Sequence, residues 1–187
     1  LEKLEYRGYD SAGIAIVDSD KKKLICHKSE GKLKNLKLKL DKKIISGSLG
    51  IGHTRWATHG KPVLENAHPH CDSTEQVAVV QNGIIENYLE LKTKLESEGI
   101  VFTSETDTEV IPHLVQKELH NLSQLNLENS GSTLLIAVRN VISDLEGAYA
   151  LAVIWSGSPD SLVVARKQAP LIIGLGEGEF VCASDTP

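Results

Sequence analysis

The order in which short apolar runs and helical repeats follow one another constrains the fold of this chain most. Two strand-like runs, residues 12–17 and 23–28, are joined by an Asp-Ser-Asp turn, and strand-like runs again follow one another over residues 148–183. Helical repeats gather between them, mainly over residues 88–145. Strand pairs with short turns and a central block of helices are typical of antiparallel sheets. The pattern therefore favours an α+β fold with largely antiparallel sheets over a doubly wound parallel sheet.

Periodicity and local signals predict the individual elements. Thr106-x-x-Glu109 has the form of a capping box, which predicts a helix that begins near Thr106. Apolar residues three or four positions apart predict the other helices. Besides that helix, the expected helices are 33–40, 88–98 and 133–145, with the end of another at 1–6. The expected strands are 12–17, 23–28, 49–53, 76–81, 148–155, 162–165, 171–173 and 180–183.

Composition limits the class of protein. At 187 residues, 41% of them hydrophobic, the chain has the size of one domain with a buried core. No apolar run approaches the length of a membrane span, and the charged N-terminus is unlike a signal peptide. Three cysteines without a secretory signal fit reduced thiols, so we expect a cytoplasmic protein. Because the chain contains no methionine, we expect it to begin inside a longer protein.

A lysine-rich segment could indicate nucleic-acid binding. Half of the 20 Lys and Arg residues lie between Lys21 and Lys43. The leucines of this segment share one helical face, however, and no aromatic residue is interleaved with the lysines. The whole chain also carries a net charge of −5. A solvated helix surface is the better interpretation, and we expect neither a nucleic acid nor a membrane as partner.

A group of histidines could indicate a metal site. His53, His59, His68, His70 and Cys71 lie in one short stretch, but their spacing matches neither CxxC nor HExxH. A structural or surface role for the histidines around Pro69 is the better interpretation, and we expect no metal.

A glycine pattern near the end of the chain could indicate a nucleotide site. Gly174-x-Gly176-x-Gly178 follows a strand, but another strand follows it where a dinucleotide-binding fold has a helix. We therefore expect a glycine-rich turn and no cofactor.

Four polar segments lie at the ends of expected strands and helices. Each has an ordinary structural interpretation: a salt-bridged turn, a polar loop, a hairpin turn and a helix cap. Their joint presence at element ends favours a binding site instead. The segments are residues 6–13, 53–60, 82–83 and 104–109.

The side chains of these segments suit a zwitterion that carries an amide. An arginine can hold an α-carboxylate through two hydrogen bonds, and Arg55 is the candidate. Asp107, near a helix start, could accept hydrogen bonds from an α-ammonium group. The Asn82 side-chain amide and the Gly83 backbone N–H could form an oxyanion hole for amide hydrolysis. Free glutamine would satisfy all of these contacts.

The same segments resemble one known family. LEYRGYDSAG, GIGHTRWATHG, NAHPH, QNGIIENY, SETDTEV, LEGAYAL and LIIGLG are similar to the glutaminase domains of glucosamine-6-phosphate synthases, from residue 1 to about 185. These are class II (N-terminal-nucleophile) glutamine amidotransferases. The resemblance implies a four-layer αββα sandwich. Amidophosphoribosyltransferases share part of the pattern and are the alternative within the same class.

The resemblance also implies residue roles. In such enzymes an N-terminal cysteine attacks the glutamine carboxamide to form a thioester, and ammonia passes through a channel to fructose 6-phosphate. Asn82 and Gly83 match the oxyanion-hole pair, and Arg7 matches an arginine close to the nucleophile. The residues that match the substrate pocket are Arg55, Trp56, Thr58, His59 and Asp107. His53 lies near the site by position but receives no role.

The chain departs from the family pattern in one respect. Cys26, Cys71 and Cys182 do not fall at the place of the nucleophile. We therefore expect residues 1–187 to be the amidotransferase domain without the strand that carries the nucleophile and without its C-terminal end. The isomerase domain, through which the family forms homodimers, is expected outside these residues. A non-catalytic glutamine-binding module is the alternative from another functional class.

Overall fold

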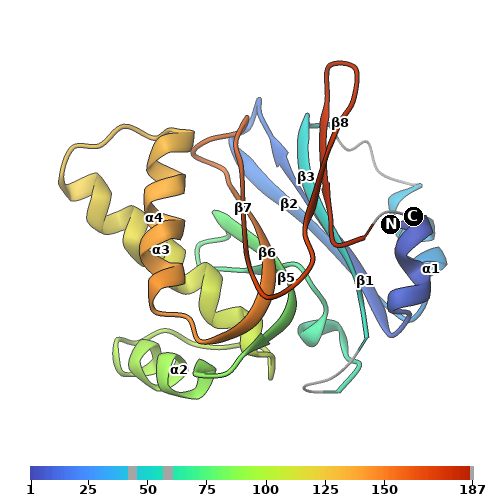
Figure 1. Ribbon diagram of the computed structural model, residues 1–187, viewed down its shortest axis with the longest axis horizontal. Helices are drawn as coiled ribbons and strands as arrows, with labels where there is room; N and C mark the ends of the chain where they lie inside the picture. The colour runs from blue at the N-terminus through green and yellow to red at the C-terminus, as the bar shows by residue number, and fades with distance from the viewer. Residues whose placement is uncertain (42–45, 57–60, 186–187) are drawn as a thin grey trace.

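Two antiparallel β-sheets lie face to face in the computed structural model, which describes residues 1–41, 46–56 and 61–185 (Figure 1). The first sheet has the strand order β2-β1-β3, with β1 at Ser11–Asp18, β2 at Lys23–Glu30 and β3 at Leu49–Arg55. The second sheet has the order β4-β5-β6-β7, with β4 at His70–Cys71, β5 at Val77–Ile85, β6 at Gly147–Trp155 and β7 at Leu162–Lys167. All of these strand pairs are antiparallel, as the sequence predicts.

Helices cover the outer face of each sheet. The 3-10 helix η1 (Glu2–Arg7) and α1 (Leu33–Leu40) lie on the first sheet. Glu5 Oε1 accepts a hydrogen bond of 3.0 Å from Leu33 N and so joins η1 to the start of α1. The helices α2 (Tyr88–Ser97), α3 (Val110–Gln124) and α4 (Gly131–Ser143) cover the second sheet. The short 3-10 helices η2 (Leu64–Asn66) and η3 (Asp107–Glu109) precede β4 and α3.

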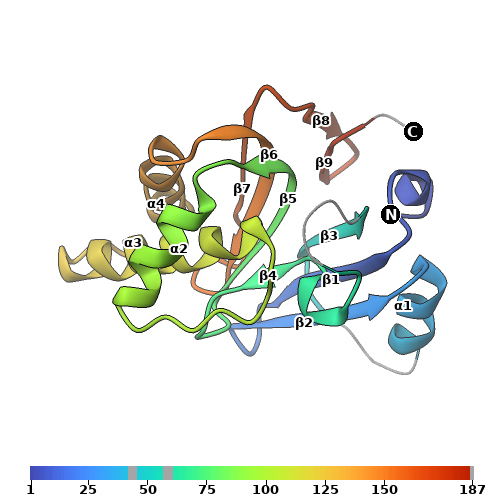
Figure 2. The same ribbon diagram turned by 90° about the horizontal axis from the view of Figure 1, so that it is seen from below.

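Figure 2 shows the order of these layers. Three hydrophobic clusters fill the three spaces between them. The largest lies between α2–α4 and the second sheet, and the second lies between the two sheets. The third, made by Ala12, Leu33 and Leu36, lies between α1 and the first sheet. The sequence prediction of a four-layer αββα sandwich is therefore confirmed.

The side chains of β5 point alternately to the two faces of the second sheet, so this one strand contributes residues to two of the clusters. Val77 and Val79 belong to the cluster under the helices, whereas Ala78 lies between the sheets with Ala15 and Ile154. Successive side chains of a strand point to opposite faces of the sheet. A strand that is buried on both faces therefore has an unbroken run of apolar residues in its sequence. Each buried valine stabilises the fold by about 1.5–3 kcal/mol.

The lysine-rich segment folds as its leucines predict. Leu33 and Leu36 of α1 are buried against the first sheet, while Lys34, Lys37 and Lys39 are exposed. The predicted apolar helix face is therefore confirmed. Among the described residues, no helix is both long and apolar enough to cross a membrane.

The last two strands form a separate hairpin. β8 (Ile172–Leu175) pairs with β9 (Phe180–Ala183) in a two-stranded sheet that projects beyond the sandwich (Figure 1). The glycine pattern at 174–178 lies in this hairpin and supplies its turn, where Gly178 has φ +73°. The predicted glycine-rich turn is confirmed.

Candidate active site

A cavity of about 400 Å³ opens at one end of the sandwich. It receives residues from η1, β3, the loops before β4 and η3, β5, β6 and β9. Six of the predicted site residues line it: Arg7, Arg55, Trp56, Asn82, Gly83 and Asp107. Two others, Thr58 and His59, lie outside the described residues. Segments that are far apart in the sequence therefore meet in one cavity.

Asn82 and Gly83 lie inside strand β5. They pair with Ala150 and Tyr149 of β6, so the interpretation of this Asn-Gly pair as a hairpin turn is wrong. Since Val80 faces the space between the sheets, the alternation of the strand places Asn82 on the same side. Within the described part of the chain, the Asn82 carboxamide makes no hydrogen bond, so its donors are available to the cavity.

Gly83 occupies a position that only glycine fits. Its φ of +128° is a conformation that L side chains rarely adopt. A Cβ atom there would also lie 2.1 Å from Ala148 O and 2.9 Å from Tyr149 Cα. The backbone of β6 therefore passes directly against Gly83, which fixes the end of β5 in a narrow geometry.

Asp107 joins the start of η3 to the end of β5. Its Oδ2 accepts a hydrogen bond of 2.7 Å from Ile85 N, two residues beyond Gly83. Asp107 lines the cavity, and only 6% of the residue is exposed. An ionised carboxylate held in this way is a strong acceptor for a cationic group.

Arg55 ends strand β3 with its guanidinium buried at the cavity. Only 4% of the residue is exposed, and Arg55 Nη1 donates a hydrogen bond of 3.3 Å to Lys61 O. Burial lowers the pKa of Arg55, while the carboxylates of Asp10 and Asp107 act in the opposite direction. Arg55 and Asp107 thus place a cation and an anion close to one another in one cavity, as a zwitterionic ligand requires.

Asn66 holds the loops around these two residues together. Its Nδ2 donates to Lys61 O at 2.9 Å and to Glu105 Oε2 at 3.2 Å, and its Oδ1 accepts from Glu105 N at 2.8 Å. The Asn66 side chain therefore connects the loop after Arg55 to the loop before Asp107. Such buried polar networks fix loop geometry because every broken bond leaves an unsatisfied group.

Arg7 connects the N-terminal helix to the end of the chain. Its Nη1 donates to Ser184 O at 3.0 Å and to Ser184 Oγ at 3.2 Å, and lies 3.6 Å from Asp185 Oδ2. The neighbouring Gly8 packs against β3, since a Cβ there would lie 2.5 Å from the carbonyl carbon of Arg55. The Arg-Gly pair thus places a cation at the cavity through close backbone contact.

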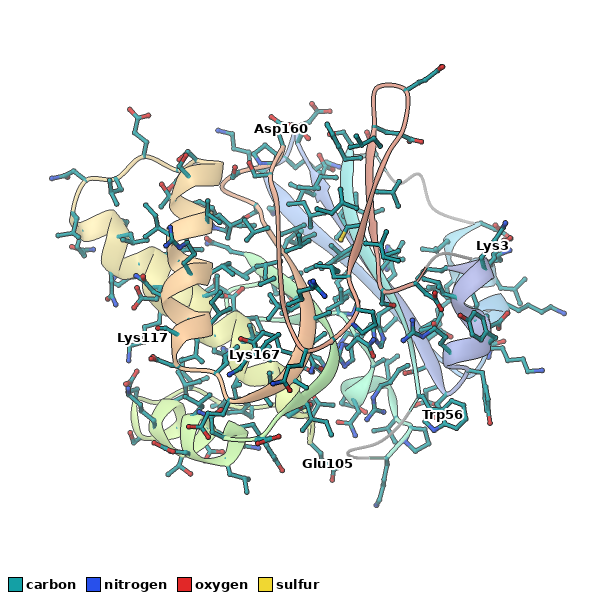
Figure 3. All side chains as sticks on the ribbon, viewed as in Figure 1. Lys3, Trp56, Glu105, Lys117, Asp160 and Lys167 are labelled. Carbon is teal, nitrogen blue, oxygen red and sulfur yellow. The ribbon has the colours of Figure 1, made fainter. Side chains whose placement is uncertain are left out.

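Trp56 stands at the rim of the cavity and is 58% exposed (Figure 3). Its ring centroid lies 5.7 Å from that of Tyr9 at a tilt of 57°. Trp56 is therefore not a residue of the hydrophobic core. An exposed aromatic ring beside a cavity can pack over a bound ligand.

Three histidines, the half-buried His53 and the buried His68 and His70, form a row beside the cavity, a feature that sequence reasoning missed. The rings of His53 and His68 are stacked with centroids 4.4 Å apart, and His70 meets His68 edge-on at 4.8 Å. His68 Nδ1 accepts from Gln81 N at 3.4 Å, and His70 Nε2 lies 3.0 Å from Thr106 Oγ1. Of the two roles left open for the histidines around Pro69, the burial of His68 and His70 agrees with the structural role and not with the surface role.

The histidine row is held in its neutral form. Burial, and then the positive charge of Arg55, lowers the pKa of His53 to about 4, and burial with Lys28 lowers that of His70 to about 3. Burial likewise lowers the pKa of His68. The described residues contain no group of three or more His, Cys, Asp or Glu side chains arranged to hold a metal ion. His53 and His68 both line the cavity, so neutral imidazoles form part of its wall.

Thr106 and Glu109 do not form the predicted capping box. The Thr106 side chain makes no cap hydrogen bond at η3 and instead contacts Ser104 Oγ and His70. The Glu109 carboxylate accepts from Thr103 N at 2.8 Å and from Ser104 N at 2.6 Å. The pattern is misleading because Glu109 folds back over the loop before η3, not onto the first turn of the helix.

Replacing Glu109 with glutamine is expected to destabilise the domain by about 2 kcal/mol, because hydrogen bonds to an ionised acceptor are lost. Burial acts to raise the pKa of Glu109, but His113 and the donors on residues 103 and 104 outweigh it and lower that pKa. The stabilisation is therefore present above the unfolded-state pKa of about 4.3 and is lost as the pH falls through the folded-state value.

Thermal melting of wild type and Glu109→Gln against pH tests this expectation. The difference in Tm should be largest near neutral pH and should shrink below about pH 4. The exposed Glu96→Gln on α2 is the matched control and should show no such difference. A Glu109→Gln difference that is the same at all pH values would show that the charge of Glu109 is unimportant.

Comparison with known proteins shows to which family the chain belongs. A model of the glutamine amidotransferase domain family matches residues 53–187, which is well over half of the chain. The chain belongs to the glutamine amidotransferase domain family. Five of the six described site residues, all except Arg7, lie within the matched range.

Curated relatives match the whole of this amidotransferase chain. A glutamine–fructose-6-phosphate aminotransferase (isomerizing) from Thermosynechococcus vestitus is 57% identical over 187 residues, which are 100% of the chain and 29% of the relative. Proteins of the same name from Nostoc sp. and Methanothermobacter thermautotrophicus are 58% and 50% identical over 100% of the chain and 29% and 30% of the relatives. The amidotransferase chain thus spans less than a third of the length of these relatives.

Solved structures share the fold. A glutamine phosphoribosylpyrophosphate amidotransferase from B. subtilis, complexed with ADP and GMP, has a TM-score of 0.77 and 30% identity over 98% of the chain and 37% of that structure. A structure described as the allosteric regulatory enzyme of purine biosynthesis has a TM-score of 0.77 and 30% identity over 97% of the chain and 37% of that structure. The αββα sandwich is therefore shared with amidotransferases of known structure.

Proposed function

We propose that the cavity binds L-glutamine and that this domain removes its amide nitrogen. The placement of Arg55 and Asp107 carries the proposal: a guanidinium and a carboxylate that are both buried line one cavity. In this binding mode the α-carboxylate meets Arg55 and the α-ammonium meets Asp107. Both charged ends are then held inside the cavity, and the side-chain amide extends along β5 toward Asn82 and Gly83.

Asn82 and Gly83 are the proposed oxyanion hole. When a thiolate adds to the carboxamide carbon, the amide oxygen gains negative charge and needs donors that are already in place. The Asn82 side-chain amide and the Gly83 backbone N–H would supply them. Gly83 suits this task because the narrow geometry of β5 and β6 leaves its backbone little freedom to move. Trp56 is proposed to pack over the bound glutamine, Thr58 and His59 to complete the pocket, and Arg7 to lie close to the nucleophile.

The proposed nucleophile is an N-terminal cysteine outside these 187 residues, with its own α-amino group as base. Cys182 lines the cavity, but burial raises the pKa of its thiol, which keeps it protonated at neutral pH. Cys26 and Cys71 do not line it. We therefore assign recognition and oxyanion stabilisation, and not the attack itself, to the residues described above.

For the whole protein we propose the reaction named by its relatives. Ammonia released from glutamine would pass to fructose 6-phosphate and yield glucosamine 6-phosphate in the cytoplasm. Identities of 50–58% to aminotransferases of that name favour this acceptor over the phosphoribosyl acceptor of the amidotransferases at 30% identity. An isomerase domain outside this chain, which would also form a homodimer, is part of the same proposal.

The acceptor is tested by supplying the intact protein with L-glutamine and either sugar phosphate. We expect glutamine-dependent formation of glucosamine 6-phosphate from fructose 6-phosphate and no phosphoribosylamine from phosphoribosyl pyrophosphate. Product formation only with phosphoribosyl pyrophosphate would favour the alternative acceptor. Glutamine binding without ammonia release would favour a non-catalytic glutamine-binding module.

Cys182→Ser in the intact protein tests the assignment of the nucleophile. Since the Cys182 thiol lines the cavity but does not attack in the proposed mechanism, kcat for ammonia release should stay within about two-fold of wild type. A loss of about 10⁴-fold or more would instead identify Cys182 as the nucleophile, because removing a covalent nucleophile has effects of that size. Cys26→Ser, outside the cavity, is the matched control.

A further inference from the structure

Two cysteines that the proposed function does not use meet between the sheets. Cys26 lies on β2 and pairs in register with Ala15, and Cys71 lies on β4 and pairs with Ala78. Ala15 and Ala78 both belong to the cluster between the sheets. Paired residues of antiparallel strands project to the same face of their sheet. The registers therefore direct Cys26 and Cys71 toward one another from opposite sheets.

The contacts agree with this placement. The Cys26 and Cys71 thiols lie close enough that each shifts the pKa of the other. Leu24, two residues before Cys26, packs against the same cluster, as does Cys71 itself. Both cysteines are free and half-buried. The pair thus sits at the rim of the inter-sheet core, where a small solute can reach it.

The surroundings favour one thiol as nucleophile. The neighbouring Cys71 thiol lowers the pKa of Cys26, and the Lys28 ammonium acts in the same direction, whereas burial and Glu75 oppose them. The neighbouring Cys26 thiol raises the pKa of Cys71, and burial adds to that effect. Lys28, two residues from Cys26 on the same strand, projects to the same face. The thiolate form is the reactive form of cysteine. Cys26 is therefore the thiol that attacks an oxidant, and Cys71 is the thiol that then attacks the oxidised Cys26 sulfur.

We propose that Cys26 and Cys71 form a peroxide-sensitive thiol pair whose oxidation to a disulfide links the two sheets. Both cysteines lie on the outermost strands of their sheets, with the order β2-β1-β3 in one and β4-β5-β6-β7 in the other. An edge strand is hydrogen-bonded on one side only, so it can shift by the small amount that an S–S bond of about 2.05 Å requires. This proposal is independent of the proposed function.

The chemistry balances with hydrogen peroxide as the oxidant. The Cys26 thiolate attacks one oxygen of the peroxide, the O–O bond breaks, and Cys26 becomes a sulfenic acid. The hydroxide that leaves takes up the proton that the Cys26 thiol lost on ionisation and becomes the first water. The Cys71 sulfur then attacks the Cys26 sulfur, the S–S bond forms, and the S–O bond breaks. The proton of the Cys71 thiol leaves with the displaced hydroxide as a second water. The two thiols lose two electrons in total, and the peroxide gains them.

A peptide map of the intact protein after treatment with equimolar hydrogen peroxide tests the pair. Trypsin should yield residues 24–28 joined to residues 56–92, a species that dithiothreitol removes. The disulfide closes a long loop, so the Tm of the domain should rise by roughly 5–10 °C in the oxidised protein. Oxidation of Cys26 to a sulfinic acid without the joined peptide, or joining of Cys26 to Cys182, would overturn the proposal.

Single variants test the order of attack. In Cys71→Ser, peroxide should leave Cys26 as a sulfenic acid that a β-diketone probe traps, whereas Cys26→Ser should give no trapped Cys71. Cys182→Ser is the matched control and should form the joined peptide as wild type does. Trapping at Cys71 in Cys26→Ser at the rate seen for Cys26 would overturn the assignment. If the serine variants fail to fold, the rate of thiol alkylation in the native wild type decides: Cys26 should react at least about ten-fold faster than Cys71.

Discussion

Arg55→Ala in the intact protein is expected to lower kcat/KM for glutamine by at least about 100-fold, which corresponds to about 3 kcal/mol. The reason is the position of Arg55, a residue that is only 4% exposed and lines the same cavity as Asp107. Removing it leaves the α-carboxylate of glutamine buried without a cation. Synthesis that uses free ammonia, if the intact protein supports it, should be unchanged, since ammonia needs no such anchor.

Two controls separate recognition from folding in this experiment. Arg139→Ala removes an exposed arginine from α4, far from the cavity, and should leave glutamine use unchanged. Arg55→Lys keeps the charge but loses the two-pronged geometry, so it should recover only part of the activity. Unchanged KM and kcat for glutamine in a folded Arg55→Ala protein would show that the anchor is assigned wrongly.

Gly83→Ala is expected to destabilise the domain by at least about 3 kcal/mol and to abolish glutamine hydrolysis. Two penalties add at this position: φ is +128°, and the new Cβ would lie 2.1 Å from Ala148 O. In a domain of this size the loss corresponds to a fall in Tm of roughly 6–12 °C. The same displacement of backbone would move the proposed oxyanion donor.

Gly99→Ala is the matched control for Gly83→Ala. Gly99 has φ +90°, but nothing lies within 4 Å of the position of its Cβ. Alanine at position 99 therefore has the energetic cost of a positive φ but no steric clash. We expect Gly99→Ala to lower the free energy of unfolding by only about 1–2 kcal/mol and to leave activity normal. Equal losses in the two variants would show that the close contact between β5 and β6 at Gly83 has no energetic importance.

The layers of the fold could be predicted from the sequence because they depend on periodicity. Antiparallel strand pairs, the apolar face of α1 and the glycine-rich hairpin turn all follow from patterns within about twenty residues. The resemblance to class II amidotransferases then supplied the αββα order of the layers. Local patterns carry no information on which edge strands face one another, so the contact between Cys26 and Cys71 appeared only in the structure.

The details that sequence reasoning missed depend on contacts over long separations. Asn-Gly is the strongest hairpin signal known, yet Gly83 lies within β5 because β6 passes against it. The Thr106-x-x-Glu109 pattern does not form a capping box because the backbone N–H groups of Thr103 and Ser104 in the preceding loop donate to Glu109 instead. The histidine row has no periodic signature, since His53 and His68 come from different strands and loops and meet only after folding.

Ammonia release by the intact protein from L-glutamine and two analogues tests most directly whether this cavity recognises both charged groups of glutamine. The analogues are 4-aminobutanamide, which lacks the α-carboxylate, and glutaramic acid, which lacks the α-ammonium group. We expect kcat/KM to fall at least about 100-fold for each. Arg55→Ala should lose most of the discrimination against the first analogue, and Asp107→Asn most of that against the second. Analogues used as well as glutamine, or variants that discriminate as wild type does, would contradict the proposed binding mode.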